Sequence, residues 1–442
     1  MRRILLFVFA AFVCASPLYA ADTLTTLDID RLAKEVEAKV IAWRRDIHQN
    51  PELGNREFRT AKLVAEHLLK LGLEVKTGVA KTGVVAVLKG GRPGPVVALR
   101  ADMDALPVVE AVDLPFASKV KGEYEGKEVG LMHACGHDTH VAILMGVAEM
   151  LAKVKDQLPG TIKFIFQPAE EGPPPGEEGG AALMIKQGVL ENPKPDVIFG
   201  LHVFAGIEAG TIAYRPGPAM ASSDRIRITV NGRQTHGALP WRGVDPIVIS
   251  SQIVLGLQTI VSRQVDVTLE PAVVTIGAIK GGVRDNIIPD SVEMLGTVRT
   301  FNEEMRADIH VRIRNTVELI AKSAGASAQV HFDNAYPVTV NDIALTERMV
   351  PTLERVAGKE QVFVGQKITG YEDFSYYQQK VPGFFYFIGI TPRRIDQSSV
   401  DLKQSAPNHS PRFFVDESAL LLGVRSLAHL TLDYMALPSK AG

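Results

Sequence analysis

The chain has 442 residues, of which 46% are hydrophobic and 22% are charged, and its formal net charge is −2. These values are ordinary for a soluble globular protein of roughly two or three domains. Because no long basic stripe or regular repeat occurs and only 7% of residues are aromatic, we expect neither a nucleic-acid partner nor a solenoid.

Residues 1–20 have the pattern of a secretory signal peptide. Two arginines precede an apolar run from Ile4 to Ala15, and Ala20 offers a small residue for cleavage. The alternative is a membrane anchor, but the apolar run has 12 residues, fewer than the roughly 20 that span a bilayer. We therefore expect an exported protein, periplasmic or secreted, with no stable membrane anchor after cleavage.

Cleavage after Ala20 would leave a single cysteine, because Cys14 is removed and only Cys135 remains. An intramolecular disulfide is then excluded. A lone thiol in an oxidising compartment favours a metal ligand or a nucleophile, although a buried inert cysteine is the common alternative.

The next part of the chain, residues 21–217, alternates helices with apolar strands. Two helices are expected between about Thr26 and Leu71, because apolar residues recur there at helical spacing. Strands are expected at 84–88, 96–100, 162–166 and 196–201, and helices at 140–154 and 181–187. This pattern predicts an α/β fold in which helices cover a mixed sheet.

The pattern changes near Gly217. Over residues 218–335 the predicted order is strand, helix, strand, strand, helix, strand, which is typical of a ferredoxin-like α+β domain. The α/β pattern returns over residues 336–442, with GFFYFIGI as a strand and ESALLLGVRSLAHLTLDYM as the closing helix. We therefore predict one α/β domain that is interrupted by a smaller inserted domain.

Metal-binding residue types gather where the predicted strands end. Asp102 and Asp104 follow one strand, Glu170 and Glu171 follow the next, and His202 follows a third. Because ligands in open α/β sheets bind at the carboxyl ends of the strands, we expect these distant segments to meet.

The segment MHACGHDTH, residues 132–140, is the densest of these clusters. Cys135 and His137 are two residues apart, so in an extended loop both side chains point the same way. A thiolate with an imidazole suits a transition metal. His140 falls in the following helix, which Asp138 is placed to cap. Taken alone, the segment also fits a core histidine beside a capped helix, but the other polar residues at the strand ends favour a metal.

The adjacent Glu170 and Glu171 permit a division of labour. Neighbours in extended geometry face opposite ways, so one carboxylate can bind a metal while the other reaches a water. A two-metal hydrolase needs this arrangement, because the metals lower the pKa of the water and the free carboxylate takes its proton. The alternative is a solvated acidic loop, since Glu177 and Glu178 follow soon after.

Together the motifs resemble the M20 metallopeptidase family, in its amidohydrolase branch of hippurate hydrolases, N-acyl-amino-acid amidohydrolases and plant auxin-conjugate hydrolases. The resemblance covers nearly the whole mature chain. It rests on RRDIHQNPELG, RADMDALPVVE, MHACGHDTH, FQPAEEG, FGLHV, THGALPWRGVDPI, DNIIPD, GYEDFSYY and APNHSPRFFVDESALLLGV. It implies a catalytic domain with an inserted lid or dimerisation domain, and hence a homodimer as one assembly to test.

The resemblance implies a metal centre with one or two divalent ions per subunit. Zinc or manganese is implied, and a mixed set of sulfur, nitrogen and oxygen ligands also accepts cobalt. The ligands implied are Cys135, His137, Glu171, His202 and His409.

The same motifs imply further roles. Glu170 matches the general base, and Asp104 matches an acid that orients a metal ligand. His236, in the inserted domain, matches a group that supports the substrate's carbonyl oxyanion, in cis or from a partner subunit. Asn286 and Arg299 match positions that hold a substrate carboxylate. A turn role for Asn286 and a surface role for Arg299 are the alternatives.

The function implied is metal-dependent hydrolysis of the amide bond of N-acyl amino acids or similar small carboxylated amides. A dipeptidase or carboxypeptidase on the same scaffold, a non-catalytic periplasmic binding protein and a structural zinc site are the alternatives. Three departures from the family pattern bear on specificity, namely the proline-rich loop Pro173–Glu178, Trp241 where histidine is frequent, and Tyr371 where a small residue is common.

Overall fold

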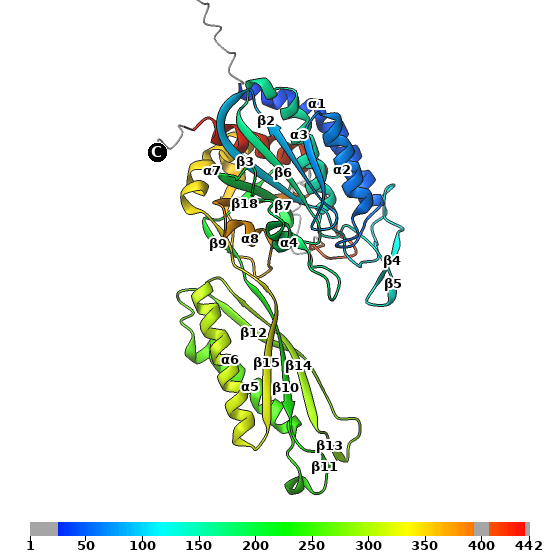
Figure 1. The fold of residues 1–442 in the computed structure, drawn as a ribbon, viewed down its shortest axis with the longest axis vertical. Coiled ribbons are helices and arrows are strands. Elements are labelled where there is room, and N and C mark those ends of the chain that lie inside the picture. The colour runs from blue at the N-terminus through cyan, green and yellow to red at the C-terminus, as the bar shows by residue number, and fades with distance from the viewer. Residues whose placement is uncertain (1–24, 393–405, 438–442) are drawn as a thin grey trace, which may run out of the picture.

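The computed structural model describes residues 25–392 and 406–437, so the predicted signal peptide lies outside the described residues. A large α/β part carries a smaller part that projects from it (Figure 1). Both predicted architectures, the helix-covered mixed sheet and the inserted ferredoxin-like unit, are confirmed.

An eight-stranded mixed sheet forms the centre of the large part, in the order β1-β2-β6-β3-β7-β18-β8-β17. Its strands are β1 (Glu74–Val79), β2 (Gly83–Lys89), β3 (Arg92–Asp102), β6 (Pro159–Gln167), β7 (Val197–Glu208), β8 (Ile212–Tyr214), β17 (Val362–Val364) and β18 (Gly383–Thr391). A separate hairpin consists of β4 (Lys121–Tyr124) and β5 (Lys127–Gly130).

Helices bury both faces of this sheet. They are α1 (Thr26–Gln49), α2 (Phe58–Lys70), α3 (His137–Ala152), α4 (Gly180–Lys186), α7 (Ile343–Ala357), α8 (Phe374–Gln378) and α9 (Ser418–Met435), with short 3₁₀ turns at Lys155–Gln157 and Lys359–Gln361. One face packs on α1, α2, α3, α7 and α9, and the other packs on α4 and α8. Because successive side chains alternate, Leu99 of β3 enters the first core and Ala98 the second. Burial on both faces explains the continuous apolar runs in the strand sequences.

The inserted part is a four-stranded antiparallel sheet in the order β12-β14-β10-β15. Its strands are β10 (Ser223–Asn231), β12 (Ala272–Gly281), β14 (Ser291–Thr300) and β15 (Ser327–Tyr336). Helices α5 (Pro246–Thr259) and α6 (Glu303–Ser323) cover one face, onto which Ile226 and Ile228 point. Arg225 and Arg227, which alternate with these isoleucines, are exposed on the opposite face.

The far tip of the inserted part is a short ribbon of β11 (Thr235–His236) and β13 (Ile287–Ile288), next to the 3₁₀ turn Pro240–Arg242 (Figure 1). A π-helical turn, Ile260–Gln264, continues α5. By length and composition alone the segment Pro246–Gln264 could cross a membrane. Its buried Ile253 and Leu257, however, pack in the core of the inserted part.

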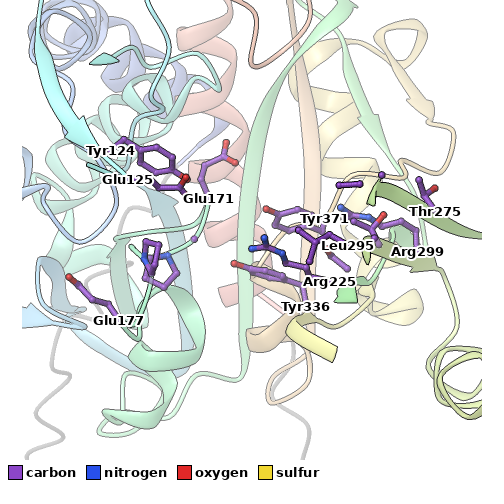
Figure 2. Close-up of a pocket in the computed structure, with 18 of the residues that line it drawn as sticks. Tyr124, Glu125, Glu171, Glu177, Arg225, Thr275, Leu295, Arg299, Tyr336 and Tyr371 are labelled. Carbon is purple, nitrogen blue, oxygen red and sulfur yellow. The ribbon is translucent and has the colours of Figure 1, made fainter. Parts of the chain in front are cut away.

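The two parts are joined by the antiparallel pair β9 (Gly217–Met220) and β16 (Thr339–Asn341). Between them lies a cleft of about 580 Å³. One wall comes from the loop that contains Pro173 and Glu177, and the other comes from the open face of the inserted sheet (Figure 2).

Candidate metal centre

The centre forms at one edge of the central sheet. Strand β3 lies between β6 and β7 and runs parallel to both, so all three carboxyl ends point the same way. Asp102 ends β3, Gln167 ends β6, and His202 lies within β7. This is the crevice in which open α/β sheets hold ligands.

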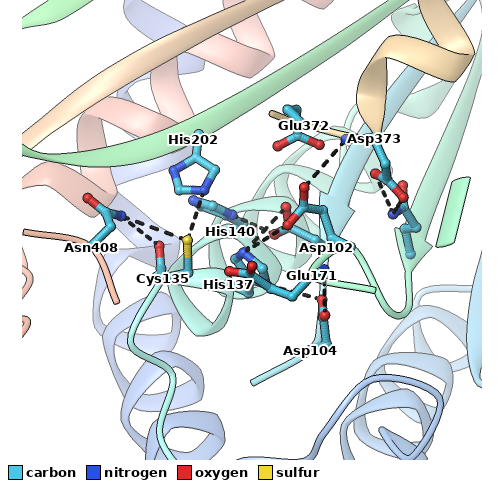
Figure 3. A network of polar contacts seen from close by, with 12 residues as sticks. Asp102, Asp104, Cys135, His137, His140, Glu171, His202, Glu372, Asp373 and Asn408 are labelled. Atoms are coloured by element: carbon cyan, nitrogen blue, oxygen red, sulfur yellow. Dashed lines mark hydrogen bonds and ion pairs between the residues drawn. The ribbon is translucent and has the colours of Figure 1, made fainter. Parts of the chain in front are cut away.

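The five predicted ligands converge there from four separate segments. Figure 3 shows four of them, Cys135, His137, Glu171 and His202. The Cys135 Sγ atom lies 3.4 Å from His202 Nε2 and 3.3 Å from His409 Nε2. His409 Nε2 is in turn 2.9 Å from Glu171 Oε1. The candidate ligand atoms of His137 lie within 4.8 Å of those of Cys135 and His202, and also of those of the glutamate pair.

The orientation of two imidazoles tests whether a cation fits. The Nδ1 of His137 is 3.2 Å from Asp104 Oδ1, and its Nε2 is buried with no hydrogen-bond partner among the described residues. His202 Nδ1 donates to the carbonyl of Val203 at 2.7 Å. Both rings therefore turn an Nε2 lone pair toward the cluster, as metal-binding histidines do. Together with a thiol and a carboxylate, these donors suit zinc or a similar divalent ion.

Unusual backbone conformations bring the ligands together. Gly136 has φ 94°, and a Cβ atom there would lie 2.3 Å from Val203 Cγ2, so glycine is required between Cys135 and His137. Ala169 and His409 also have positive φ, 51° and 70°. Strain of this kind persists where the surrounding structure enforces it, frequently at functional sites.

These conformations correct two local expectations. The Cys135–His137 segment is not extended, because Gly136 is left-handed and His137 begins α3. Glu170 and Glu171 lie in a turn rather than in an extended segment. The side chains still converge on the site, because these turns bring them there in place of the expected extended segments.

A positive charge would stabilise the ionised forms of the buried acidic groups in this cluster. Burial, with the Glu171 carboxylate, raises the pKa of the Cys135 thiol. Hydrogen bonds to Cys135 and Glu171 raise the pKa of His409 to about 10. Burial, reinforced by Glu372, Glu171 and Asp373, raises the pKa of Glu170 well above its ordinary value. A bound divalent cation would reverse these shifts by stabilising the thiolate and the carboxylates.

A buried network of ion pairs around Arg100 lies beside the candidate metal ligands. Arg100 is 1% exposed and its guanidinium contacts three carboxylates, with distances of 2.6 Å to Asp102, 2.9 Å to Glu372 and 2.8 Å to Asp373. The backbone N–H of Asp373 also donates to Glu170 Oε1 at 3.4 Å. Sequence reasoning assigned no role to this network, although RADMDALP and GYEDFSYY contain all four of its charged residues.

His140 and Asp138 also act within the protein rather than on a cation. Asp102 Oδ1 lies 2.6 Å from His140 Nδ1, and His140 Nε2 accepts the backbone N–H of Val203 at 2.9 Å, which holds β7 beside His202. The prediction that Asp138 caps α3 is wrong, because Gly136 is the capping residue and no side chain caps the helix. Asp138 instead binds Arg44 at 2.9 Å and His48 at 2.8 Å.

Arg299 reaches the centre from the inserted part. It lines both the interdomain cleft and a smaller cavity of about 220 Å³ that also contacts Cys135, Glu170 and His202. Its Nη1 atom is buried without a hydrogen-bond partner among the described residues. The guanidinium carbon lies 4.9 Å from the centre of the Tyr371 ring, which fixes its plane.

His236 and Asn286 lie close to each other but not close to the metal ligands of the same chain. Both are exposed at the far tip, where Gly237 N–H donates to the carbonyl of Asn286 at 2.8 Å. Neither lines the cavity or the cleft. Trp241, at the same tip, is 74% exposed.

The Peptidase family M20/M25/M40 model matches residues 98–433, a span that includes every predicted metal ligand. The chain belongs to this family. It is 44% identical over 401 residues to thermostable carboxypeptidase 2 of Saccharolobus solfataricus, covering 90% of this chain and 95% of that one. It is 39% identical over 386 residues to the N-acetyl-L-cysteine deacetylase of Bacillus subtilis, covering 87% and 86%.

A solved structure gives the same result for the fold. The YXEP protein of Bacillus subtilis, described as a dinuclear metal-binding peptidase of the M20 family, superposes with a TM-score of 0.74 at 36% identity and covers 91% of this chain and 99% of that one. The M20 enzyme is therefore a metal-dependent amidohydrolase or peptidase. This finding confirms the predicted family and enzyme class, and it rejects the alternative of a non-catalytic binding protein.

Proposed function

We propose that this M20 enzyme hydrolyses the amide bond of N-acyl amino acids and similar small carboxylated amides. One observation carries the proposal. The half-buried Arg299 lines the cavity that holds the metal ligands, and its Nη1 has no hydrogen-bond partner in the part of the chain that the structure describes. A buried cationic donor without a partner is costly unless a ligand satisfies it. A substrate carboxylate matches the guanidinium fork, and the neighbouring amide then lies beside the ligand cluster.

In this proposal Glu170 is the proton carrier. When bound, the divalent ions polarise the scissile carbonyl and acidify a water molecule. Glu170 lines the same cavity, so its carboxylate lies where it can take the proton of the water. It then delivers that proton to the leaving nitrogen. Asp104 holds His137 through its Oδ1 atom and accepts the Glu171 N–H at 2.9 Å, so it positions two ligands at once.

We propose that a second copy of the chain supplies His236. The Ala238 N–H donates to His236 Nδ1 at 3.0 Å, which leaves Nε2–H as a free donor suited to an oxyanion. In one chain, strand β11, which contains His236, lies at the far tip of the inserted part (Figure 1), and His236 lines neither the cavity nor the cleft. A homodimer through the inserted part would place it, with Asn286, over the partner's cleft.

A carboxypeptidase activity is the second candidate. The 44% identity to a thermostable carboxypeptidase favours it. Both activities release an amino acid with a free carboxylate, so Arg299 serves either one. The difference lies on the acyl side, where a carboxypeptidase must accept a peptide.

Two further proposals concern the location of the protein and the identity of its metal. The arginines, apolar run and small residues of segment 1–20 support export to the periplasm or the medium. The mixed sulfur, nitrogen and oxygen donors support zinc or manganese, with cobalt as a substitute.

The test is a substrate panel with metal titration on the mature protein. We expect N-acetyl-methionine to be hydrolysed, N-acetyl-methioninamide to be a poor substrate because it lacks the carboxylate, and a chelator to abolish turnover. Dipeptides with free and with acetylated N-termini separate the two candidates. Equal rates for the acid and its amide would contradict the role of Arg299.

A further inference from the structure

Beside Arg299 the cleft contains a second cation, Arg225, that the proposed mechanism does not use. We propose that the preferred leaving amino acid carries a side-chain carboxylate, as in N-acyl-glutamate or N-acyl-aspartate, and that Arg225 recognises it. This inference rests on the proposed function and names the substrate class of the same site.

The sheet geometry places the two arginines side by side. Arg225 of β10 lies directly opposite Thr297 of β14, and Thr297 lies opposite Thr275 of β12. Arg299 is two residues beyond Thr297, so it projects from the same open face. Diagonal neighbours of this kind have Cβ atoms roughly 7–8 Å apart. All four side chains line the interdomain cleft.

Among the described residues, no carboxylate forms an ion pair with either of these two arginines. The guanidinium of Arg225 has no ion pair or hydrogen bond within residues 25–392 and 406–437. Asp333 is opposite Arg225 on β15, but its ion pair is with Arg227, at 3.9 Å. Asp224 is engaged by Arg306 at 2.8 Å. Two adjacent cations without a counter-charge repel each other, so an anionic ligand would stabilise both.

The opposite wall of the cleft adds no cation, and two of its three acids, Glu177 and Glu171, are engaged by other groups. Glu177, in the proline-rich loop, is bound by Arg56 at 2.6 Å, by Asn55 at 3.0 Å and by Lys81. Glu171 belongs to the metal cluster. Figure 2 shows both glutamates across the cleft from Arg225 and Arg299. Glu125 also lines that side, so the positive charge is confined to the inserted part.

A substrate with two carboxylates fits this arrangement. The α-carboxylate binds Arg299, which alone reaches the metal cavity, and the side-chain carboxylate extends along the sheet to Arg225. Glutamine has the same shape as glutamate but lacks the charge. It therefore isolates the contribution of Arg225.

The experiment compares kcat/KM for N-acetyl-L-glutamate, N-acetyl-L-glutamine and N-acetyl-L-methionine in the metal-loaded enzyme. We expect about a tenfold preference for glutamate over glutamine, as charge-assisted hydrogen bonds give. Arg225→Gln should remove that preference, while the two substrates with uncharged side chains keep their rates. Arg227→Gln is the matched control, because Arg227 lies on the same strand and face but does not line the cleft.

The outcomes separate this inference from the proposed function. Hydrolysis of all three substrates without a preference for glutamate would overturn the inference alone. An equal loss for all three in Arg225→Gln would also overturn it, since it would show a structural role. If none of the three is hydrolysed, the proposed function fails and this inference fails with it.

Discussion

The large part and the inserted part of this M20 enzyme hold their functional groups in opposite ways. In the large part they are buried and interlocked, as in the contacts of Arg100 with Asp102, Glu372 and Asp373. In the inserted part, Arg225 and His236 are exposed. A buried network of ion pairs fixes the positions of its side chains before the substrate binds. An exposed cation, in contrast, gains its counter-charge from the ligand that binds to it. The large part therefore holds its groups in a fixed geometry, whereas the exposed groups of the inserted part remain available to a ligand or to a partner subunit.

The largest effect is expected at Glu170, the proposed proton carrier. Glu170→Gln keeps the shape of the side chain but removes the base, so kcat should fall by about 10²–10⁴-fold. Metal content, measured by elemental analysis, and the free energy of unfolding should stay near those of the wild type. Retained activity would assign proton transfer to another group.

The buried network should govern stability. Arg100→Met leaves three buried carboxylates without their cation, and the free energy of unfolding should drop by about 3–5 kcal/mol. Urea titration measures the loss. Arg227→Gln, which removes an exposed arginine with a 3.9 Å ion pair, is the control and should change little. Similar losses in both variants would refute the contrast between the two parts.

The inserted part should act across the subunit boundary. His236→Gln removes the proposed oxyanion donor and should lower kcat by about 10²–10³-fold. Co-assembled with Glu170→Gln, it should recover about a quarter of wild-type activity, because half of the dimers are mixed and each has one complete site of two. No recovery in verified mixed dimers would place His236 in cis.

Asp104 contacts two of the candidate metal ligands, so its removal should lower the affinity of the site for metal. Asp104→Ala frees the His137 ring and the Glu171 N–H, so affinity for zinc should weaken by about 10–100-fold. Competition with a chelator measures it. The exposed Asp156 provides a control, and an equal loss in Asp156→Ala would contradict a specific role.

The smallest effect is expected from pH. Burial alone lowers the pKa of His48, but Asp138 and Glu110 outweigh burial and the net shift is upward. The stabilisation is complete below the unfolded value of about 6.5 and is lost as pH rises through the folded-state pKa. Across this range, the free energy of unfolding should fall more steeply with rising pH in the wild type than in His48→Gln. The same slope in both would exclude His48.

Chemistry that depends on residue type could be predicted from the amino-acid sequence. Histidine, cysteine and glutamate side chains can bind a metal wherever they lie in the fold, so the motifs were enough to identify the candidate ligands. Strand and helix periodicity likewise predicted both sheets, because burial on one or two faces leaves its pattern in the chain. Asp138 was misassigned because its cap role was inferred from neighbours in sequence, whereas Arg44 and His48 approach from another helix.

Only the tertiary structure decided which charges are satisfied. Nothing local distinguishes Arg100, enclosed by three carboxylates, from Arg225, which has no ion-pair partner among the described residues, because partners come from strands and loops remote in sequence. The sequence determines which groups are available to bind metal and substrate. Folding determines which of them are already paired, and the unpaired ones are those that remain for a ligand.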